Sequence, residues 1–228
     1  MTNFRIKKAF GIIGSLLIAF FILPSVVPAE DMITSGGKRP VRIAIIPFQS
    51  LLPEEGSGNA VISPIHGAGY SGGKIDKGAN EIVGELFTEK LNAFKDVKIM
   101  PSEKVNAFYG RINAESLKKP VIDVLKKTGA ELGVDILAVG YVFRYMERIG
   151  YDYSAEKPAS VGFEISFINV KNGEAIWHGV FDKTQKSLME DVFQISSFYK
   201  GGGKWLTARQ LTQQGLDEVL KTFSGFDF

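Results

Sequence analysis

The chain contains no cysteine and only two histidines, His66 and His178. The absence of cysteine excludes disulfides, a thiolate metal site, a cysteine nucleophile and a lipid-modified N-terminal cysteine. The two histidines are far apart in the sequence and no cluster of carboxylates accompanies them, so we predict no metal site. We expect His178 to be a polar residue on the outer face of a strand, and packing alone to hold the fold.

Sequence motifs of catalysis are also absent. There is no G-x-S-x-G elbow and no H-E-x-x-H pattern. Residues 67–72 match G-x-G-x-x-G, but a dinucleotide site needs these glycines directly after a strand. The preceding strand is expected to end far upstream, at Phe48, so we interpret the pattern as part of a flexible loop. We therefore predict a non-enzymatic protein without a cofactor.

The chain also lacks an excess of charge of one sign. Lysine and arginine number 27 and aspartate and glutamate 25. Three of the cations, Arg5, Lys7 and Lys8, lie at the N-terminus, and the remainder has one more acidic than basic residue. A nucleic-acid partner is therefore not expected, because its phosphates would require a basic stripe. The hydrophobic fraction of 45% is sufficient for a packed core.

The N-terminal 29 residues have the order of a secretory signal peptide. Basic residues precede the apolar run 9–23, and Val27-Pro28-Ala29 offers small residues at a cleavage site. A retained anchor is the alternative, because residues 9–27 approach the ~20 apolar residues of a spanning helix. Either interpretation predicts an exported protein of the periplasm or cell envelope, attached to the inner membrane if residues 9–27 are not removed.

The remaining pattern predicts a linker over 30–40 and a single α/β (α+β) domain over 41–228. Its βα units, C-terminal β-hairpin and closing helix favour a mixed β-sheet flanked by helices. A long glycine-rich loop is expected over 49–77. The apolar and amphipathic stretches place strands over 41–48, 97–100, 134–145, 161–170 and 175–181, and helices over 80–94, 101–108, 114–132 (restarted at Pro120), 188–198 and 207–223.

Two short signals define local geometry near the C-terminus. Asn172-Gly173 favours a tight hairpin turn, because this pair adopts positive φ readily. Thr207 is a suitable N-cap, and Gln210 three residues later completes a capping-box pattern.

The aromatic residues suggest an interface. Tyr141, Phe143 and Tyr145 are expected to share one face of a strand, in the core or beneath a helix. Tyr151 and Tyr153 fall in a loop, and exposed tyrosines are enriched at protein interfaces. The candidate interface residues are Tyr145, Tyr151, Tyr153 and Trp205.

Two segments carry a resemblance to a known group of proteins. Residues 133–142 (GVDILAVGYV) and 163–177 (FEISFINVKNGEAIW) resemble the TolB N-terminal-domain, curli-secretion (CsgG-like) and LpoB-type superfamily of the bacterial envelope. Residues 41–48 resemble its first strand, and residues 203–208 resemble lipoproteins of unknown function in it. Many of these relatives are anchored through a cysteine, which this chain lacks. The segment 143–163 is also too short and charged for the membrane hairpins of curli-type channels.

The resemblance implies an interaction or assembly module in secretion, surface-structure assembly or control of cell-wall synthesis. Its partners would be other envelope proteins, and a homo-oligomer is one option. One alternative is an exported small-ligand binder or enzyme that uses the loop 49–77 as a lid over the carboxyl end of the first strand. Another alternative is a ring-forming secretion subunit.

Overall fold

The computed structural model describes residues 39–116, 118–152, 154–185 and 204–226. The chain divides into two units, residues 1–37 and residues 38–228, and everything below concerns the second unit. The predicted signal peptide, most of the linker and the predicted helix over 188–198 lie outside the described residues. None of the described helices has both the length and the hydrophobicity needed to cross a bilayer.

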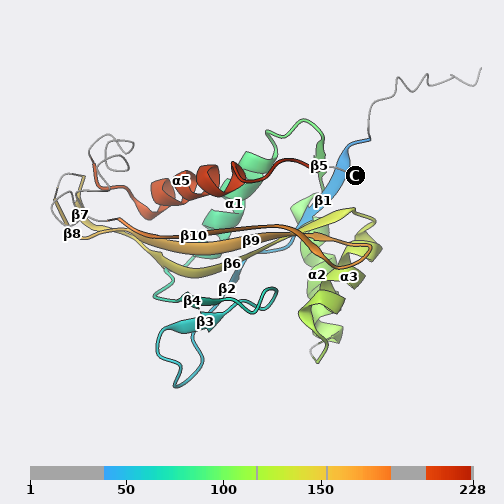
Figure 1. Cartoon of the computed structure of the whole chain (residues 1–228), viewed down its shortest axis with the longest axis horizontal. Coiled ribbons are helices and arrows are strands. Elements are labelled where there is room, and N and C mark those ends of the chain that lie inside the picture. The colour runs from blue at the N-terminus through green and yellow to red at the C-terminus, as the bar shows by residue number, and fades with distance from the viewer. Residues whose placement is uncertain (1–38, 117, 153, 186–203, 227–228) are drawn as a thin grey trace, which may run out of the picture. The chain divides into compact units, whose positions relative to one another are not determined.

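A mixed sheet forms the centre of the fold, as the sequence predicts (Figure 1). Its strand order is β10-β9-β6-β1-β5, and the short β2 pairs with β6 beyond the end of β1. The strands β5, β1, β6 and β2 run parallel, whereas β9 and β10 are antiparallel additions. These strands are β1 (Val41–Ile45), β2 (Gln49–Ser50), β5 (Val97–Ile99), β6 (Ile136–Met146), β9 (Ser160–Asn169) and β10 (Ala175–Thr184).

Helices cover the two faces of this sheet unequally. Helices α1 (Ala79–Leu91) and α5 (Ala208–Leu220) lie along one face, which we call the helical face (Figure 1). Helices α2 (Ser102–Glu115) and α3 (Val121–Leu132) cover only one end of the opposite face, called here the open face. Helix α2 runs further than predicted, and Pro120 separates it from α3 as expected, because proline suits the start of a helix.

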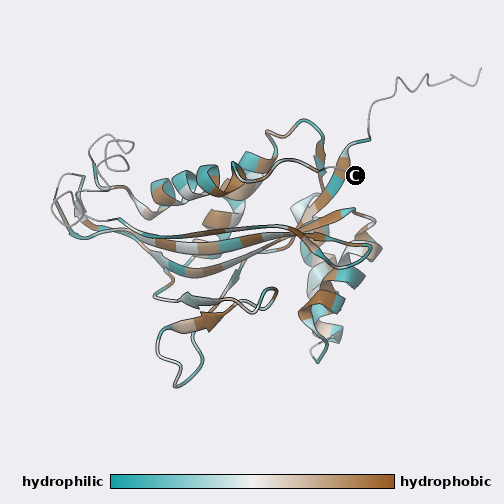
Figure 2. Cartoon of the chain, viewed as in Figure 1, coloured by the Kyte–Doolittle hydropathy of each residue, from teal (hydrophilic) through white to brown (hydrophobic). Residues whose placement is uncertain are grey.

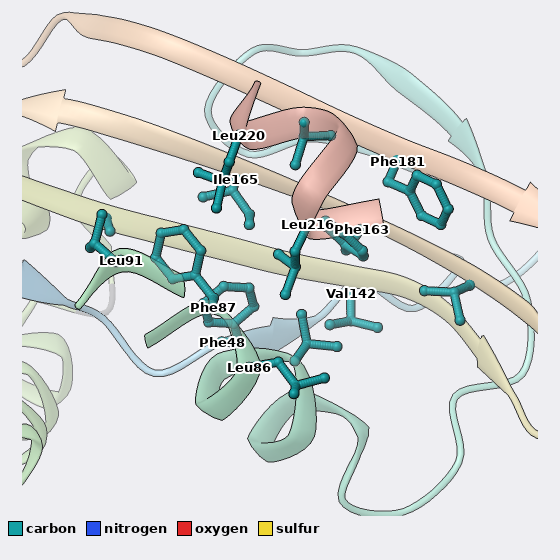
Figure 3. Packing of buried hydrophobic residues seen from close by; sticks show 14 of the residues in the cluster. Phe48, Leu86, Phe87, Leu91, Val142, Phe163, Ile165, Phe181, Leu216 and Leu220 are labelled. Carbon is teal, nitrogen blue, oxygen red and sulfur yellow. The ribbon is translucent and has the colours of Figure 1, made fainter. Parts of the chain in front are cut away.

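The main core lies between the helical face and helices α1 and α5. Phe163, Ile165 and Phe167 alternate along β9 and are fully buried there. Phe87 of α1 and Leu216 of α5 contribute from the helix side (Figure 3). Each such side chain stabilises the fold by roughly 1.5–3 kcal/mol through the apolar surface it removes from water. Figure 2 shows the corresponding alternation of hydrophobic and hydrophilic residues along the long strands.

The predicted capping box of the last helix is present. The Gln210 amide donates to Thr207 Oγ1 at 3.1 Å, and the Thr207 amide donates to Gln210 Oε1 at 3.0 Å. The predicted turn at Asn172-Gly173 is also confirmed, with Gly173 at a φ of 81°. Asp135, in one of the segments that carry the resemblance, has a structural contact: it accepts from the Arg42 amide at 3.0 Å and so joins β1 to β6.

The prediction of a loop without secondary structure over 49–77 is wrong. Besides β2, this segment contains the hairpin β3 (Ala60–Ile62) and β4 (Gly69–Ser71), which lies over the open face (Figure 1). Val61 is buried beneath it, and the Gly73 amide donates to Phe143 O at 2.9 Å. These are contacts with residues distant in sequence, so local glycine content concealed them. A second unpredicted hairpin joins β7 (Ile149–Tyr151) to β8 (Ser154–Lys157).

The prediction that Tyr141, Phe143 and Tyr145 share one face is also wrong. A β-bulge in β6 lies between Val142 and Arg144, where the register with β9 shifts by one residue. An extra residue reverses the alternation of side chains beyond it. Tyr141 therefore packs in the cluster beneath α2 and α3, whereas Tyr145 packs in the core of the helical face.

Candidate functional site

A cluster of polar side chains lies on the open face of the sheet, in the middle of β9 and β10. Glu164 and Ser166 alternate with the core phenylalanines of β9 and therefore point away from the helical face. His178 lies opposite Ser166 on β10 and shares its face. Glu164 is only 1% exposed and Ser166 only 2% exposed, so the cluster has a buried base.

The β3–β4 hairpin completes this cluster from above. The Tyr70 hydroxyl donates to Glu164 Oε2 at 2.8 Å, and the Tyr70 ring stacks on Phe143 with centroids 4.7 Å apart. His66 Nε2 lies 2.8 Å from Ser166 Oγ. These contacts, together with the bond that Arg144 on β6 donates to Ser71 O on β4 at 2.8 Å, hold the hairpin on the sheet.

The two histidines meet within the cluster. Their ring centroids are 3.9 Å apart, and His178 Nε2 lies 3.1 Å from Glu164 Oε2. Burial lowers the pKa of His66, the proximity of His178 lowers it further, and Glu164 opposes both effects. The net direction favours a neutral His66 imidazole in the folded protein.

Glu164 is the least satisfied group of the site. Its Oε2 bonds to Tyr70 and His178, but its buried Oε1 has no hydrogen-bond partner among the described residues. A buried carboxylate needs partners for both oxygens, because desolvation strongly disfavours the charged form. The same surroundings raise the pKa of Tyr70, through burial first and the bond to Glu164 second.

The arrangement does not match a catalytic triad. In a triad the carboxylate orients the same histidine that receives the proton of the nucleophile. Here Glu164 bonds to His178, whereas Ser166 bonds to His66. Ser166 is also too buried for a substrate to reach its hydroxyl. Within the described part of the chain, no group of three or more His, Asp or Glu residues is placed to hold a metal ion.

Sequence reasoning did not find this cluster. His178 was expected on an outer sheet face, and it does lie on the face without α1 and α5, but it is half-buried and bonded to Glu164. His66 joins it from a position 112 residues earlier in the chain. The available signal was the pair Glu164 and Ser166, two polar residues at alternate positions within an otherwise apolar strand.

The predicted interface residues lie in different environments. Tyr145 is 4% exposed and belongs to the main core, so its side chain is not available to a partner in this structure. Tyr151 is 82% exposed on β7. Trp205 is half-buried, and its amide donates to Asp152 O at 2.7 Å. Tyr153 lies outside the described residues.

A groove of about 670 Å³ lies at the carboxyl ends of β1 and β5, between α1 and the start of α2. Its floor is apolar, with Ile45, Ile99 and Met100, and α1 contributes acidic side chains such as Glu85 to its rim. None of residues 49–77 lines this groove. In this structure the segment therefore does not cover the groove as the alternative of a lid requires, because its β3–β4 hairpin lies over the open face instead.

The edge of the sheet beside the polar cluster is β10. It is ten residues long and pairs with β9 on one side, while no described strand pairs with its other side. Val180, opposite Glu164 in the register, is 37% exposed on the open face. His178 and Asp182 flank Val180 on this face, and the carboxylate of Asp182 forms an ion pair with Arg144.

Comparisons with known proteins concern the fold. No family model matches the sequence, and no curated protein matches it. The chain is similar to the solved PelC dodecamer from Paraburkholderia phytofirmans, at 12% identity and a TM-score of 0.46, covering 84% of this chain and 92% of that one. It is similar to lipoprotein GNA1162 from Neisseria meningitidis, at 12% identity and a TM-score of 0.38, covering 72% and 94%.

The LpoB C-terminal domain from Escherichia coli is also similar, at 9% identity and a TM-score of 0.39, covering 66% of this chain and 87% of that domain. LpoB belongs to one of the groups that the sequence resembles. At these identities the similarity describes the arrangement of strands and helices and carries no information about activity.

Proposed function

We propose that this chain is an exported, non-enzymatic protein of the bacterial cell envelope that binds other envelope proteins. It would serve secretion, assembly of surface structures or control of cell-wall synthesis. The observation that carries the proposal is the long outer edge of β10, which no described strand covers. Such an edge presents a row of backbone donors and acceptors that can pair with a strand of another protein.

The side chains of β10 add specificity to this edge. Val180 offers exposed apolar surface on the open face, and His178 and Asp182 offer polar groups on either side of it. In strand addition, backbone hydrogen bonds provide affinity and alternate side chains provide selection. The β10 edge has both elements over its ten residues.

Export is supported by the order of basic, apolar and small residues over 1–29. Binding rather than catalysis is supported by the polar cluster, because its one hydroxyl paired with histidine, on Ser166, is buried. The hydrogen bonds of the cluster instead hold the β3–β4 hairpin against the face beside β10. Because these bonds hold the hairpin in one position, the surface beside the β10 edge has one defined shape.

Site-specific photocross-linking in the source bacterium tests this function. A photoreactive amino acid at Val180 is expected to capture a defined envelope protein, identified by mass spectrometry. The matched control carries the same probe at Lys104, an exposed position on α2. No adduct at Val180, or the same adducts at both positions, would contradict the proposal. N-terminal sequencing of the fractionated protein would establish its compartment and whether residues 1–29 are removed.

A further inference from the structure

We infer that β10 pairs with β10 of a second copy of this chain, in an antiparallel two-fold dimer centred on Val180. This inference rests on the proposed role of the β10 edge in binding, and it goes beyond the proposed function because it names a second copy of this chain as the occupant of that edge. The sheet would continue through the contact, from β9 and β10 of one copy into β10 and β9 of the other. The register of such a dimer is decided by which side chains of β10 would face one another.

Symmetry restricts how an edge strand can pair with itself. Opposed residues in an antiparallel pair point to the same face of the sheet. The open face must also continue as the open face across the contact. The two-fold axis must therefore lie midway between the two copies of one residue of β10, so that this residue is opposed to itself. Each possible central residue therefore defines one register, and the registers can be compared by their opposed pairs.

A centre on Val180 gives complementary pairs on both faces. On the open face Val180 meets its own copy, and His178 meets Asp182 of the second copy. On the helical face Trp177 meets Lys183 of the second copy, which places the Lys183 ammonium beside the Trp177 indole ring. Val180 is partly exposed in the single chain, so the contact would bury apolar surface that now faces water.

Centres one residue away are worse. A centre on Gly179 places the carboxylate of Asp182 opposite Ile176, and a centre on Phe181 places it opposite Val180. Each pairing would place an apolar side chain against the ion pair of Asp182 with Arg144 and supply no new polar partner. The exposed valine would also lose its apolar partner in both registers.

Centres two residues away are also worse. A centre on His178 places Asp182 beyond the first residue of the second copy's β10, Ala175, so it has no opposed residue in the strand, and a centre on Asp182 places this carboxylate opposite its own copy. Like charges directly opposed across strands are destabilising. Of the five centres within the middle of β10, the one on Val180 alone opposes His178 to Asp182 and Val180 to its own copy.

The absence of cysteine makes the register directly testable. In this register the Cα atoms of residue 180 in the two copies would lie ~4.5–5.5 Å apart, a spacing that a disulfide can bridge. A Val180→Cys variant, purified from the envelope of the expressing cell, is expected to form a disulfide-linked dimer under mild oxidation. The matched control is Thr184→Cys, which is exposed on the same strand and would lie about 27 Å from its copy.

A second measurement uses chains without an added thiol. The unmodified protein is expected to sediment at twice its mass, and Val180→Lys to sediment as a monomer, because two ammonium groups would meet at the axis. Thermal unfolding would show that the lysine variant remains folded. A monomeric unmodified protein, larger rings, or equal oxidation of the two cysteine variants would overturn the inference.

The outcomes separate this inference from the proposed function. A monomer in solution that still captures an envelope protein through position 180 would overturn the dimer and leave the proposed function intact. A dimer that captures only its own copy in cells would support the dimer and contradict binding to other envelope proteins.

Discussion

The two faces of the central sheet bury different kinds of side chain. The helical face buries phenylalanines and aliphatic side chains beneath α1 and α5 and has few polar groups. The open face buries a carboxylate and a serine beneath a glycine-rich hairpin, and one tyrosine, Tyr141, in the cluster beneath α2 and α3. Apolar packing depends little on the orientation of the side chains, whereas hydrogen bonds and ion pairs require partners at defined distances and angles. The helical face therefore provides stability, and the open face defines one particular arrangement of the hairpin.

The largest expected effect tests the helical face. Phe163→Ala removes a fully buried ring whose centroid lies 5.5 Å from that of the Phe181 ring. We expect a loss of about 3–5 kcal/mol in the free energy of unfolding. Urea denaturation monitored by circular dichroism measures it. Leu52→Ala, at a strongly exposed position outside β10, is the control and should change stability by less than about 0.5 kcal/mol. Similar losses in the two variants would remove the distinction between core and surface.

The next effect tests the open face. Tyr70→Phe removes the hydroxyl that donates to Glu164, and we expect a loss of about 1–3 kcal/mol, because a buried carboxylate loses one of its two partners. The ring would still stack on Phe143, so packing is nearly unchanged. Tyr151→Phe, on an exposed residue, serves as the control in the same denaturation experiment. An unchanged stability of Tyr70→Phe would mean that the hairpin is not held by this bond.

A smaller effect is expected at the start of α5, on the helical face. Thr207→Ala removes the acceptor of the capping box, and we expect a loss of about 1 kcal/mol. Thr207→Ser retains the hydroxyl and should restore most of the stability. Thermal unfolding compares the three proteins. If the serine and alanine variants are equally destabilised, the loss comes from the methyl group and not from the cap.

The smallest effect is a pH dependence confined to the open face. The pKa of His66 is lowered in the folded protein, so the unfolded chain binds the proton more tightly. Stability should therefore be complete above the ordinary pKa of 6.5 and decline as the pH falls below it. Melting temperatures between pH 7.5 and 5 measure the slope, and His66→Gln should reduce it. An identical slope in the variant would mean that His66 is not the source of the dependence.

The sequence predicted the helical face well and the open face poorly, for a physical reason. Alternation in β9, the 3.6-residue period of α1 and the cap at Thr207 are local patterns, and the structure confirms each of them. The meeting of His66 with His178 depends on where the hairpin folds back, which no local pattern encodes. The bulge near Phe143 likewise depends on pairing between β6 and β9. The polar residues within β9 were the single local indication that something covers the open face.

The bulge in β6 has a consequence for how sequences of this design can change. Because one additional residue separates the two halves of the strand, side chains before and after it have opposite phases. Deletion of Phe143 would place Arg144 directly after Val142 and still opposite Gly162, so Arg144 would keep its bonds to Ser71 and Ser160 and Tyr145 would stay in the core. The deletion would remove the ring that stacks on Tyr70. The strand should therefore tolerate the loss of this residue better than the loss of its neighbours, with weaker attachment of the hairpin as the expected result.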